Sequence, residues 1–230
     1  METWDFWQDG DGSPAVNMAT DEALLLTASG RGRPLLRFYG WDRPSVSIGY
    51  VQSLASAPGG FAVVRRPTGG GIVYHDFDFT YTVVFPAGHW LTGLDRIRSY
   101  AVLNESVQRG LAVLDMQSQL SSLEISPSVD RATMVCFTHP TRYDILLNGH
   151  KIAGSAQRRT QDGLLHQGSL HFGGPLPFSR DKLAEALLRG FREVMNLEIV
   201  EFTPTDDLRK VIADLARDKY SQDVWNAKRP

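Results

Sequence analysis

Apolar residues follow two different spacings along this chain. Runs rich in β-branched and aromatic residues predict strands at Leu36–Tyr39, Ser45–Tyr50 and Phe79–Phe85, whereas apolar residues three and four positions apart predict helices at Met18–Leu26 and Ile97–Leu114. Both kinds of element alternate along the chain, so neighbouring and distant strands can pair. The pattern therefore predicts a mixed α/β fold.

The stretch after Phe172 is short and also mixed. It predicts a helix at Ser179–Met195, a strand at Leu197–Phe202 and a helix from Asp206 to about Lys219, with Ser179 and Thr205 as N-caps. The chain has 230 residues, of which 42% are hydrophobic, enough for one core. We therefore expect residues 173–230 to complete a domain rather than to form a second one.

One glycine-rich segment, RRPTGGGIVYHD (65–76), places Gly69–Gly71 between two short apolar runs. Residues Phe61, Val63 and Val64 before it, and Ile72–Tyr74 after it, are typical of strands. A glycine run lets the backbone approach a ligand closely, although it is also typical of a passive turn. Because strands flank it on both sides, we interpret this run as a ligand-binding loop.

A second segment, NGHKIAGSAQRR (148–159), repeats this organisation. The apolar run Tyr143–Leu147, the turn signal Asn148–Gly149 and the run His150–Ala153 predict a hairpin. Lys151 follows the turn, where a lysine is ordinarily a solvated surface residue. The small residues Gly154–Ala156 leave a groove toward which its ammonium could direct its donors.

Five segments resemble, in the same order, the motifs of the lipoate-protein ligase and octanoyltransferase family: NMATDEALL (17–25), LRFYGWDRPSVSIGYVQ (36–52), RRPTGGGIVYHD, KIAGSAQRR (151–159) and HQGSLHF (166–172). The resemblance implies the biotin/lipoate ligase catalytic fold, which is class II synthetase-like, with a mixed, largely antiparallel sheet and flanking helices. Such a domain would span residues 1–230. Members attach octanoyl or lipoyl groups to one lysine of a lipoyl domain or of the glycine-cleavage H protein.

The resemblance also implies roles for particular residues. Lys151 matches the family lysine that contacts the acyl carbonyl, and no metal ligand is implied. The residues that match substrate-binding positions are Arg66, Thr68, Gly69, Gly70, Gly71, His75, Gly154, Ser155, Ala156 and Arg158.

Cys136 is the only cysteine, and CFTHPTRYD (136–144) resembles a run of the cysteine-dependent octanoyltransferases. A thiolate is a strong nucleophile toward a thioester, and a nearby cation such as Lys151 raises the thiolate fraction. Lys151 could then stabilise the oxyanion of the tetrahedral intermediate. A lone cysteine between Val135 and Phe137 is also typical of a small buried hydrophobe.

The chain departs from the family pattern at two places. The first leaves open whether it is a cysteine-dependent octanoyltransferase or an ATP-dependent ligase. Cysteine-dependent enzymes usually have G-G-R where this chain has Gly70 and Gly71, and the triple glycine is commoner in ATP-dependent ligases. His166 stands one position earlier than the histidine of the Q-H-G-S form, so it is given no catalytic role.

Three functions therefore remain. The first is an acyltransferase that moves an octanoyl or lipoyl group from acyl carrier protein through a Cys136 thioester to a lysine and requires no cofactor. The second is the catalytic subunit of an ATP-dependent lipoate-protein ligase, which works through lipoyl-AMP with ATP and Mg and needs a separate accessory subunit. The third is a non-catalytic acyl or carrier-docking module.

Charge and targeting limit the partners. A net charge of −2, from 24 basic and 26 acidic residues, argues against nucleic acid. The pairs Arg65–Arg66 and Arg158–Arg159 are expected to face acidic surfaces of acyl carrier protein or a lipoyl domain. The sequence shows no run of about 18 apolar residues and no signal peptide, so we expect a cytoplasmic protein without membrane contact. Gln117–Asp130 is expected to be a flexible loop, either gating or passive.

Overall fold

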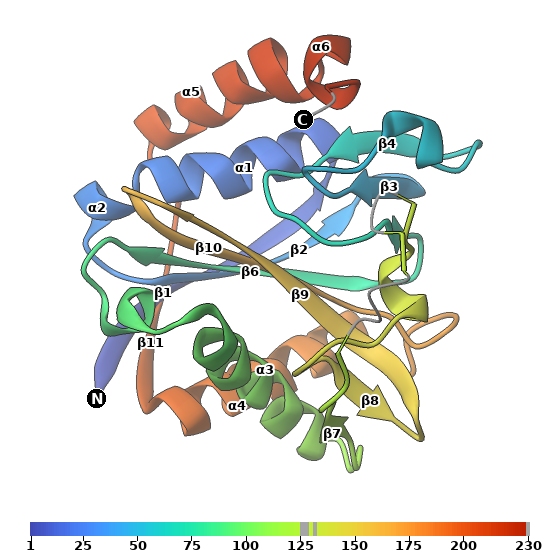
Figure 1. Cartoon of the computed structure of the whole chain (residues 1–230). Helices are drawn as coiled ribbons and strands as arrows, with labels where there is room; N and C mark the ends of the chain where they lie inside the picture. Colours follow the sequence, from blue (N-terminus) through green and yellow to red (C-terminus); the bar gives the residue numbers. More distant parts are fainter. Residues whose placement is uncertain (125–128, 131–132, 229–230) are drawn as a thin grey trace.

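The computed structural model describes residues 1–124, 129–130 and 133–228, and its centre is an eight-stranded sheet (Figure 1). The strands lie in the order β11 (Leu197–Glu201), β1 (Glu2–Gly12), β2 (Leu35–Trp41), β6 (Phe79–Pro86), β10 (Gly163–Leu170), β9 (His150–Thr160), β8 (Ile145–Leu147) and β7 (Gln119–Leu120). Among the described residues of this sheet, β1 pairs in parallel with β11 and with β2, and the other pairs are antiparallel. The predicted mixed, largely antiparallel sheet is confirmed.

A smaller three-stranded sheet carries the first glycine-rich loop. Its order is β4 (Ala62–Arg65), β3 (Ser45–Ile48) and β5 (Val73–His75), and residues 66–72 connect β4 to β5. β3 is shorter than the predicted Ser45–Tyr50, because the chain turns at Gly49, whose N–H donates to Oε1 of Gln52. A Cβ on Gly49 would collide with the carbonyl oxygen of Gly70, so the two loops can pack closely only at a glycine.

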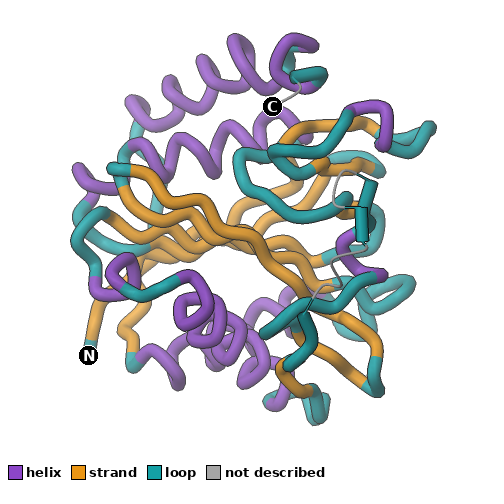
Figure 2. The backbone as a smooth tube through the Cα atoms, in the orientation of Figure 1, coloured by secondary structure: helices purple, strands orange, loops and turns teal. Residues whose placement is uncertain are grey.

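Helices cover both faces of the large sheet (Figures 1 and 2). On one face α1 (Pro14–Leu26) lies on the strands, with the short helix α2 (Ala28–Arg31) after it and α5 (Asp206–Leu215) packed on its outer side. On the other face α3 (Arg96–Ala112) and α4 (Arg180–Met195) pack tightly together. A Cβ on Gly110 would lie 2.7 Å from Cα of Leu187, so this contact requires a glycine.

The apolar interior lies between the sheet and the pair α3 and α4. Trp4, Phe85 and Phe191 are fully buried there, and the rings of Trp4 and Phe85 meet edge to face with centroids 5.1 Å apart. A second cluster between α1, the sheet and α5 includes Leu24 and Leu208. The two layers hold the strands that carry the site residues in a fixed register.

The C-terminal elements differ slightly from prediction. The N-caps are confirmed, since the hydroxyls of Ser179 and Thr205 accept from N–H groups three residues ahead. α5 ends at Leu215 and continues as a π-helical turn to Tyr220, instead of one helix to Lys219, and α6 (Asp223–Asn226) follows. That a single domain spans the chain stays a prediction.

The loop predicted at Gln117–Asp130 is interrupted by the short strand β7, and its residues 125–128 lie outside the described part of the chain. Within the residues that the structure describes, no helix is both long and apolar enough to cross a membrane.

Candidate active site

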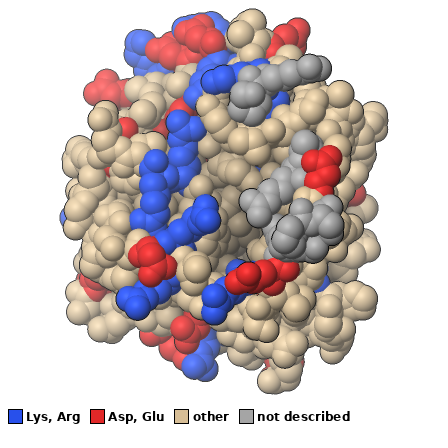
Figure 3. All heavy atoms as spheres, in the orientation of Figure 1, with Lys and Arg blue, Asp and Glu red and all other residues tan. Residues whose placement is uncertain are grey.

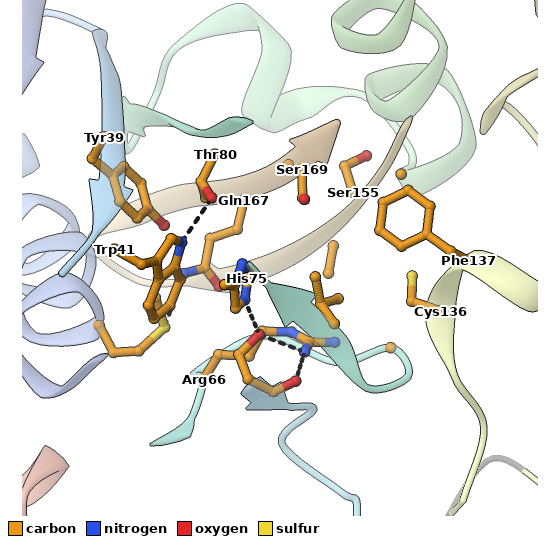
Figure 4. Close-up of a pocket in the computed structure, with 17 residues that line it drawn as sticks. Tyr39, Trp41, Arg66, His75, Thr80, Cys136, Phe137, Ser155, Gln167 and Ser169 are labelled. Atoms are coloured by element: carbon orange, nitrogen blue, oxygen red, sulfur yellow. Dashed lines mark hydrogen bonds between the residues drawn. The ribbon is translucent and has the colours of Figure 1, made fainter. Parts of the chain in front are cut away.

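Two cavities meet at Cys136. A narrow inner cavity of about 50 Å³ is mostly apolar, and an outer cleft of about 370 Å³ opens toward solvent. Figure 4 shows the inner one, with Cys136 and Phe137 at one end and Trp41 at the other. The residues that line both cavities are Gly70, Cys136, Ser155 and Ala156. The sulfur therefore lies at the junction between a narrow, mostly apolar cavity and a cleft that opens toward solvent.

Lys151 directs its ammonium at Cys136. Its Nζ lies 3.4 Å from the Cys136 Sγ and donates to the carbonyl oxygen of Cys136 at 2.9 Å. Lys151 is on β9 and Cys136 begins a 3-10 turn, Cys136–Thr138. The structure thus brings together the two residues that the sequence suggested for catalysis.

Asp144 is the counter-ion of this lysine. Its Oδ2 lies 2.7 Å from Lys151 Nζ and also accepts from the N–H and the hydroxyl of Thr141, at 2.6 and 2.9 Å. Burial alone would lower the pKa of Lys151, but its electrostatic interactions and hydrogen bonds with Cys136 and Asp144 outweigh burial and raise that pKa. The ammonium is therefore held in its charged form beside the sulfur.

Gly154 makes room for this arrangement. A Cβ at that position would lie 2.6 Å from Cε and 2.8 Å from Nζ of Lys151. The Lys151 side chain consequently packs across a bare stretch of its own strand, which explains why small residues follow the lysine in the sequence.

The glycine-rich loop and the cysteine segment are joined by backbone hydrogen bonds. Ile72 donates its N–H to the carbonyl of Met134, and Cys136 donates to the carbonyl of Ile72, both at 2.8 Å. A Cβ on Gly71 would lie 2.5 Å from the Met134 oxygen and 2.9 Å from the Cys136 nitrogen. Gly71 is therefore required by the docking of the cysteine segment, which gives a structural reason for a glycine at this position.

Arg66 holds the glycine-rich loop in place through hydrogen bonds to backbone carbonyls. Its guanidinium donates to the carbonyls of Gly69, Gly71 and Ser47, at 2.6, 2.7 and 2.9 Å. Burial lowers the pKa of Arg66 to about 10, which still leaves it charged at neutral pH. Arg66 thus fixes the loop and adds a positive charge near Cys136.

Thr68 lies behind the loop. Its hydroxyl donates to Oε1 of Gln167 at 2.6 Å, and Nε2 of Gln167 donates to Oδ2 of Asp21 at 2.7 Å. Asp21 is fully buried on α1 and is paired with Arg37 at 2.8 Å. Helix α1 is in this way linked through side chains to the glycine-rich loop.

His75 lies in the wall of the inner cavity. Its ring stacks on Trp41 with centroids 3.8 Å apart (Figure 4). Its two nitrogens contact Ser47 Oγ at 2.8 Å and Asp78 Oδ2 at 2.7 Å. Burial would raise the pKa of Asp78, but His75 and two hydroxyl donors outweigh burial and lower it.

The structure contradicts one expectation about charge and places three other residues outside both cavities. Arg65 and Arg66 are buried, 0% and 5% exposed, so the expectation that this pair faces an acidic partner is wrong. Thr68 and Arg158 line neither cavity, and Arg158 donates instead to the carbonyl of Pro67. His166 is fully buried, and burial lowers its pKa to about 3.

Two polar residues that hold the site were missed from sequence. Asp144 belongs to the CFTHPTRYD run, but nothing local shows that its partner is Lys151. Gln52 is fully buried and donates to the carbonyl of Met134 at 3.0 Å, which secures the segment before Cys136. Within the described ranges, no three His, Cys, Asp or Glu side chains gather as a metal site.

Comparisons with known proteins cover nearly the whole chain. The family described as the lipoyl protein ligase A/B catalytic domain matches residues 13–206. The octanoyltransferase LipM of Anoxybacillus flavithermus is 32% identical over 275 aligned positions, which cover 99% of each chain. LipM of Bacillus subtilis is 29% identical over 279 positions, again 99% of each.

Solved structures agree with this result. A lipoate-protein ligase A bound with ATP superposes with a TM-score of 0.84 at 25% identity, over 99% of each chain. A bi-partite lipoate protein ligase from Thermoplasma acidophilum, at 23% identity and a TM-score of 0.77, covers 99% of this chain and 97% of that one and shares the fold. The predicted resemblance and enzyme class are confirmed, and the chain belongs to the lipoyl protein ligase A/B catalytic domain family.

Proposed function

We propose that this enzyme transfers an octanoyl (or lipoyl) group from acyl carrier protein, through a thioester on Cys136, to one lysine of a lipoyl domain or of the glycine-cleavage H protein. The observation that carries the proposal is the 3.4 Å contact between Cys136 Sγ and Lys151 Nζ at the junction of the two cavities. The octanoyltransferase names of the similar proteins support it. A reducing cytoplasm, which keeps a free thiol reduced, is the proposed compartment.

In the first half-reaction the acyl chain lies in the inner cavity with its carbonyl beside Cys136. The thiolate attacks the carbonyl carbon, and the carbon–sulfur bond to the carrier breaks, so the carrier leaves as a thiolate that takes a proton from water. Lys151 already donates to Asp144 and to the Cys136 carbonyl, so its third N–H, which points at the sulfur, is available for the oxyanion.

In the second half-reaction a neutral lysine amine enters the outer cleft and attacks the thioester on Cys136. The bond between carbon and Sγ breaks, Cys136 is released as a thiolate, and the amine loses its proton to solvent. The product is an amide, which is more stable than a thioester. The reaction uses no cofactor, and Lys151 serves both steps from one position.

An ATP-dependent lipoate ligase is the second candidate. It is favoured by the triple glycine Gly69–Gly71 and by the superposition on a ligase bound with ATP. That reaction would require ATP and Mg, and an accessory subunit beside this chain.

The two candidates differ in their requirement for ATP. We expect the protein to octanoylate a lipoyl domain from octanoyl carrier protein without ATP, and Cys136→Ala to lose this activity. When the protein is incubated with lipoate, ATP and labelled pyrophosphate, no label should pass from pyrophosphate into ATP. Pyrophosphate exchange that persists in Cys136→Ala would establish the ligase reaction instead.

A further inference from the structure

Two arginines that border the outer cleft have no acidic partner among the residues that the structure describes. Arg96, in the first turn of α3, and Arg142, before β8, both line the cleft and are exposed. Among residues 1–124, 129–130 and 133–228, no carboxylate oxygen lies within 4.0 Å of either guanidinium. By contrast, Arg37 and Arg217 each contact two carboxylates.

The charge of the cleft is positive overall. Lys151 is its third cation, and Asp144, the acid that lines it, already pairs with Lys151 at 2.7 Å. The other titratable groups that line the cleft are His139, Tyr100 and Cys136. Figure 3 shows Lys and Arg side chains in a row along one rim of a hollow on this face. Two guanidiniums that line the same cleft as Cys136, and that have no carboxylate partner among the described residues, favour a partner that brings carboxylates.

Which partner binds Arg96 and Arg142 depends on how far each reacting group lies from the surface of the protein that carries it. The amine of a lysine is separated from its own backbone by only four methylene groups, so the acceptor backbone must come to the mouth of the cleft. The side chains next to the acceptor lysine then lie against the rim. A carrier protein presents its thioester on a longer prosthetic arm, so its surface stays farther from Arg96 and Arg142.

We infer that Arg96 and Arg142 bind carboxylates that flank the acceptor lysine, and so select the acceptor protein. This inference rests on the proposed function, because it takes the outer cleft as the entrance for the amine. Arg96 and Arg142 help the acceptor protein to bind and to align its lysine, and they take no part in the chemistry at Cys136.

The test separates the two half-reactions. Acyl-enzyme is first made from octanoyl-pantetheine, an uncharged donor, and isolated. Its reaction with a lipoyl domain is then timed for the parent, for Arg96→Gln/Arg142→Gln, and for Arg189→Gln, which removes one charge from an exposed arginine of α4 outside the cleft. A free lysine derivative with blocked α-groups serves as an acceptor without flanking carboxylates.

The double variant should react about tenfold more slowly with the lipoyl domain, and Arg189→Gln and the lysine derivative should show no such loss. Raising the salt concentration should slow the parent and have little effect on the double variant. If the double variant instead loses acylation by octanoyl carrier protein and keeps the lipoyl-domain step, the rim belongs to the donor and the inference is wrong.

A direct binding measurement tests the inference independently of the proposed function. The dissociation constant of an unmodified lipoyl domain is measured by calorimetry with the same variants, where no acyl transfer takes place. About tenfold weaker binding in the double variant alone supports the inference, and equal binding in all three proteins overturns it. Failure of every thioester to acylate the parent would refute the proposed function and leave this binding result to stand by itself.

Discussion

Gly154→Ala is predicted to separate catalysis from stability. The new Cβ would lie 2.6 Å from Lys151 Cε, whereas ordinary contact begins near 3.4 Å, so the side chain has to move by about 0.8 Å (3.4 − 2.6). The group that moves is the far end of a flexible side chain rather than backbone. The free energy of unfolding should therefore change by less than about 1 kcal/mol.

The catalytic loss should be much larger, because the ammonium leaves its position beside Cys136. A displacement near 1 Å in a reacting site costs about 100-fold in rate, which corresponds to about 2.7 kcal/mol of activation free energy. The assay is octanoyl transfer to a lipoyl domain, with urea unfolding as the stability measurement. Gly10→Ala, a strand glycine with nothing within 4 Å of the added Cβ, is the matched control. A Gly154→Ala enzyme with the parent's rate would show that the position of Lys151 is not important.

Three further changes test other parts of the site. Asp144→Asn removes the counter-ion of a buried lysine and should cost about 3 kcal/mol in urea unfolding and at least tenfold in transfer rate; a rate equal to the parent's would argue against this ion pair. Gly71→Ala should push the backbone of the cysteine segment away and reduce transfer by about 100-fold in the same assay, whereas Gly174→Ala, in open space, should have no effect. His166 has a folded-state pKa of about 3, below its unfolded value near 6.5, so the unfolded chain takes up the proton first and stability falls as pH falls through this window. Between pH 7 and pH 5 urea unfolding should show a loss of about 2 kcal/mol that is absent in His166→Gln, and an equal loss in both proteins would contradict the assignment.

The parts of the fold with strong local patterns could be predicted from sequence. The strand predicted at Phe79–Phe85 is β6, Phe79–Pro86, because a continuous run of β-branched and aromatic residues is typical of a central strand. β1, Glu2–Gly12, was not predicted. Its sequence, ETWDFWQDGDG, has polar residues without regular alternation, and its parallel pairing with β11 joins segments almost a whole chain apart.

The candidate site likewise contains residues that could be predicted from the sequence and residues that could not. Cys136 and Lys151 stand in short runs that resemble family motifs, and this resemblance, rather than the residue types alone, indicated their chemistry. The requirement for glycine at position 71 could not be predicted, because it comes from a backbone contact with Met134 that only the folded chain creates. The buried positions of Arg65 and Arg66 likewise depend on carbonyl groups far away in the sequence that accept their hydrogen bonds.

The central claim is that the acyl group passes through Cys136. It is tested most directly by mixing the protein with octanoyl carrier protein in the absence of any acceptor, quenching in acid and measuring the intact mass. We expect the addition of one octanoyl group, located by peptide mapping on Cys136, released by hydroxylamine and absent from Cys136→Ala. An unmodified Cys136 in an enzyme that still octanoylates a lipoyl domain from the same donor would contradict the claim.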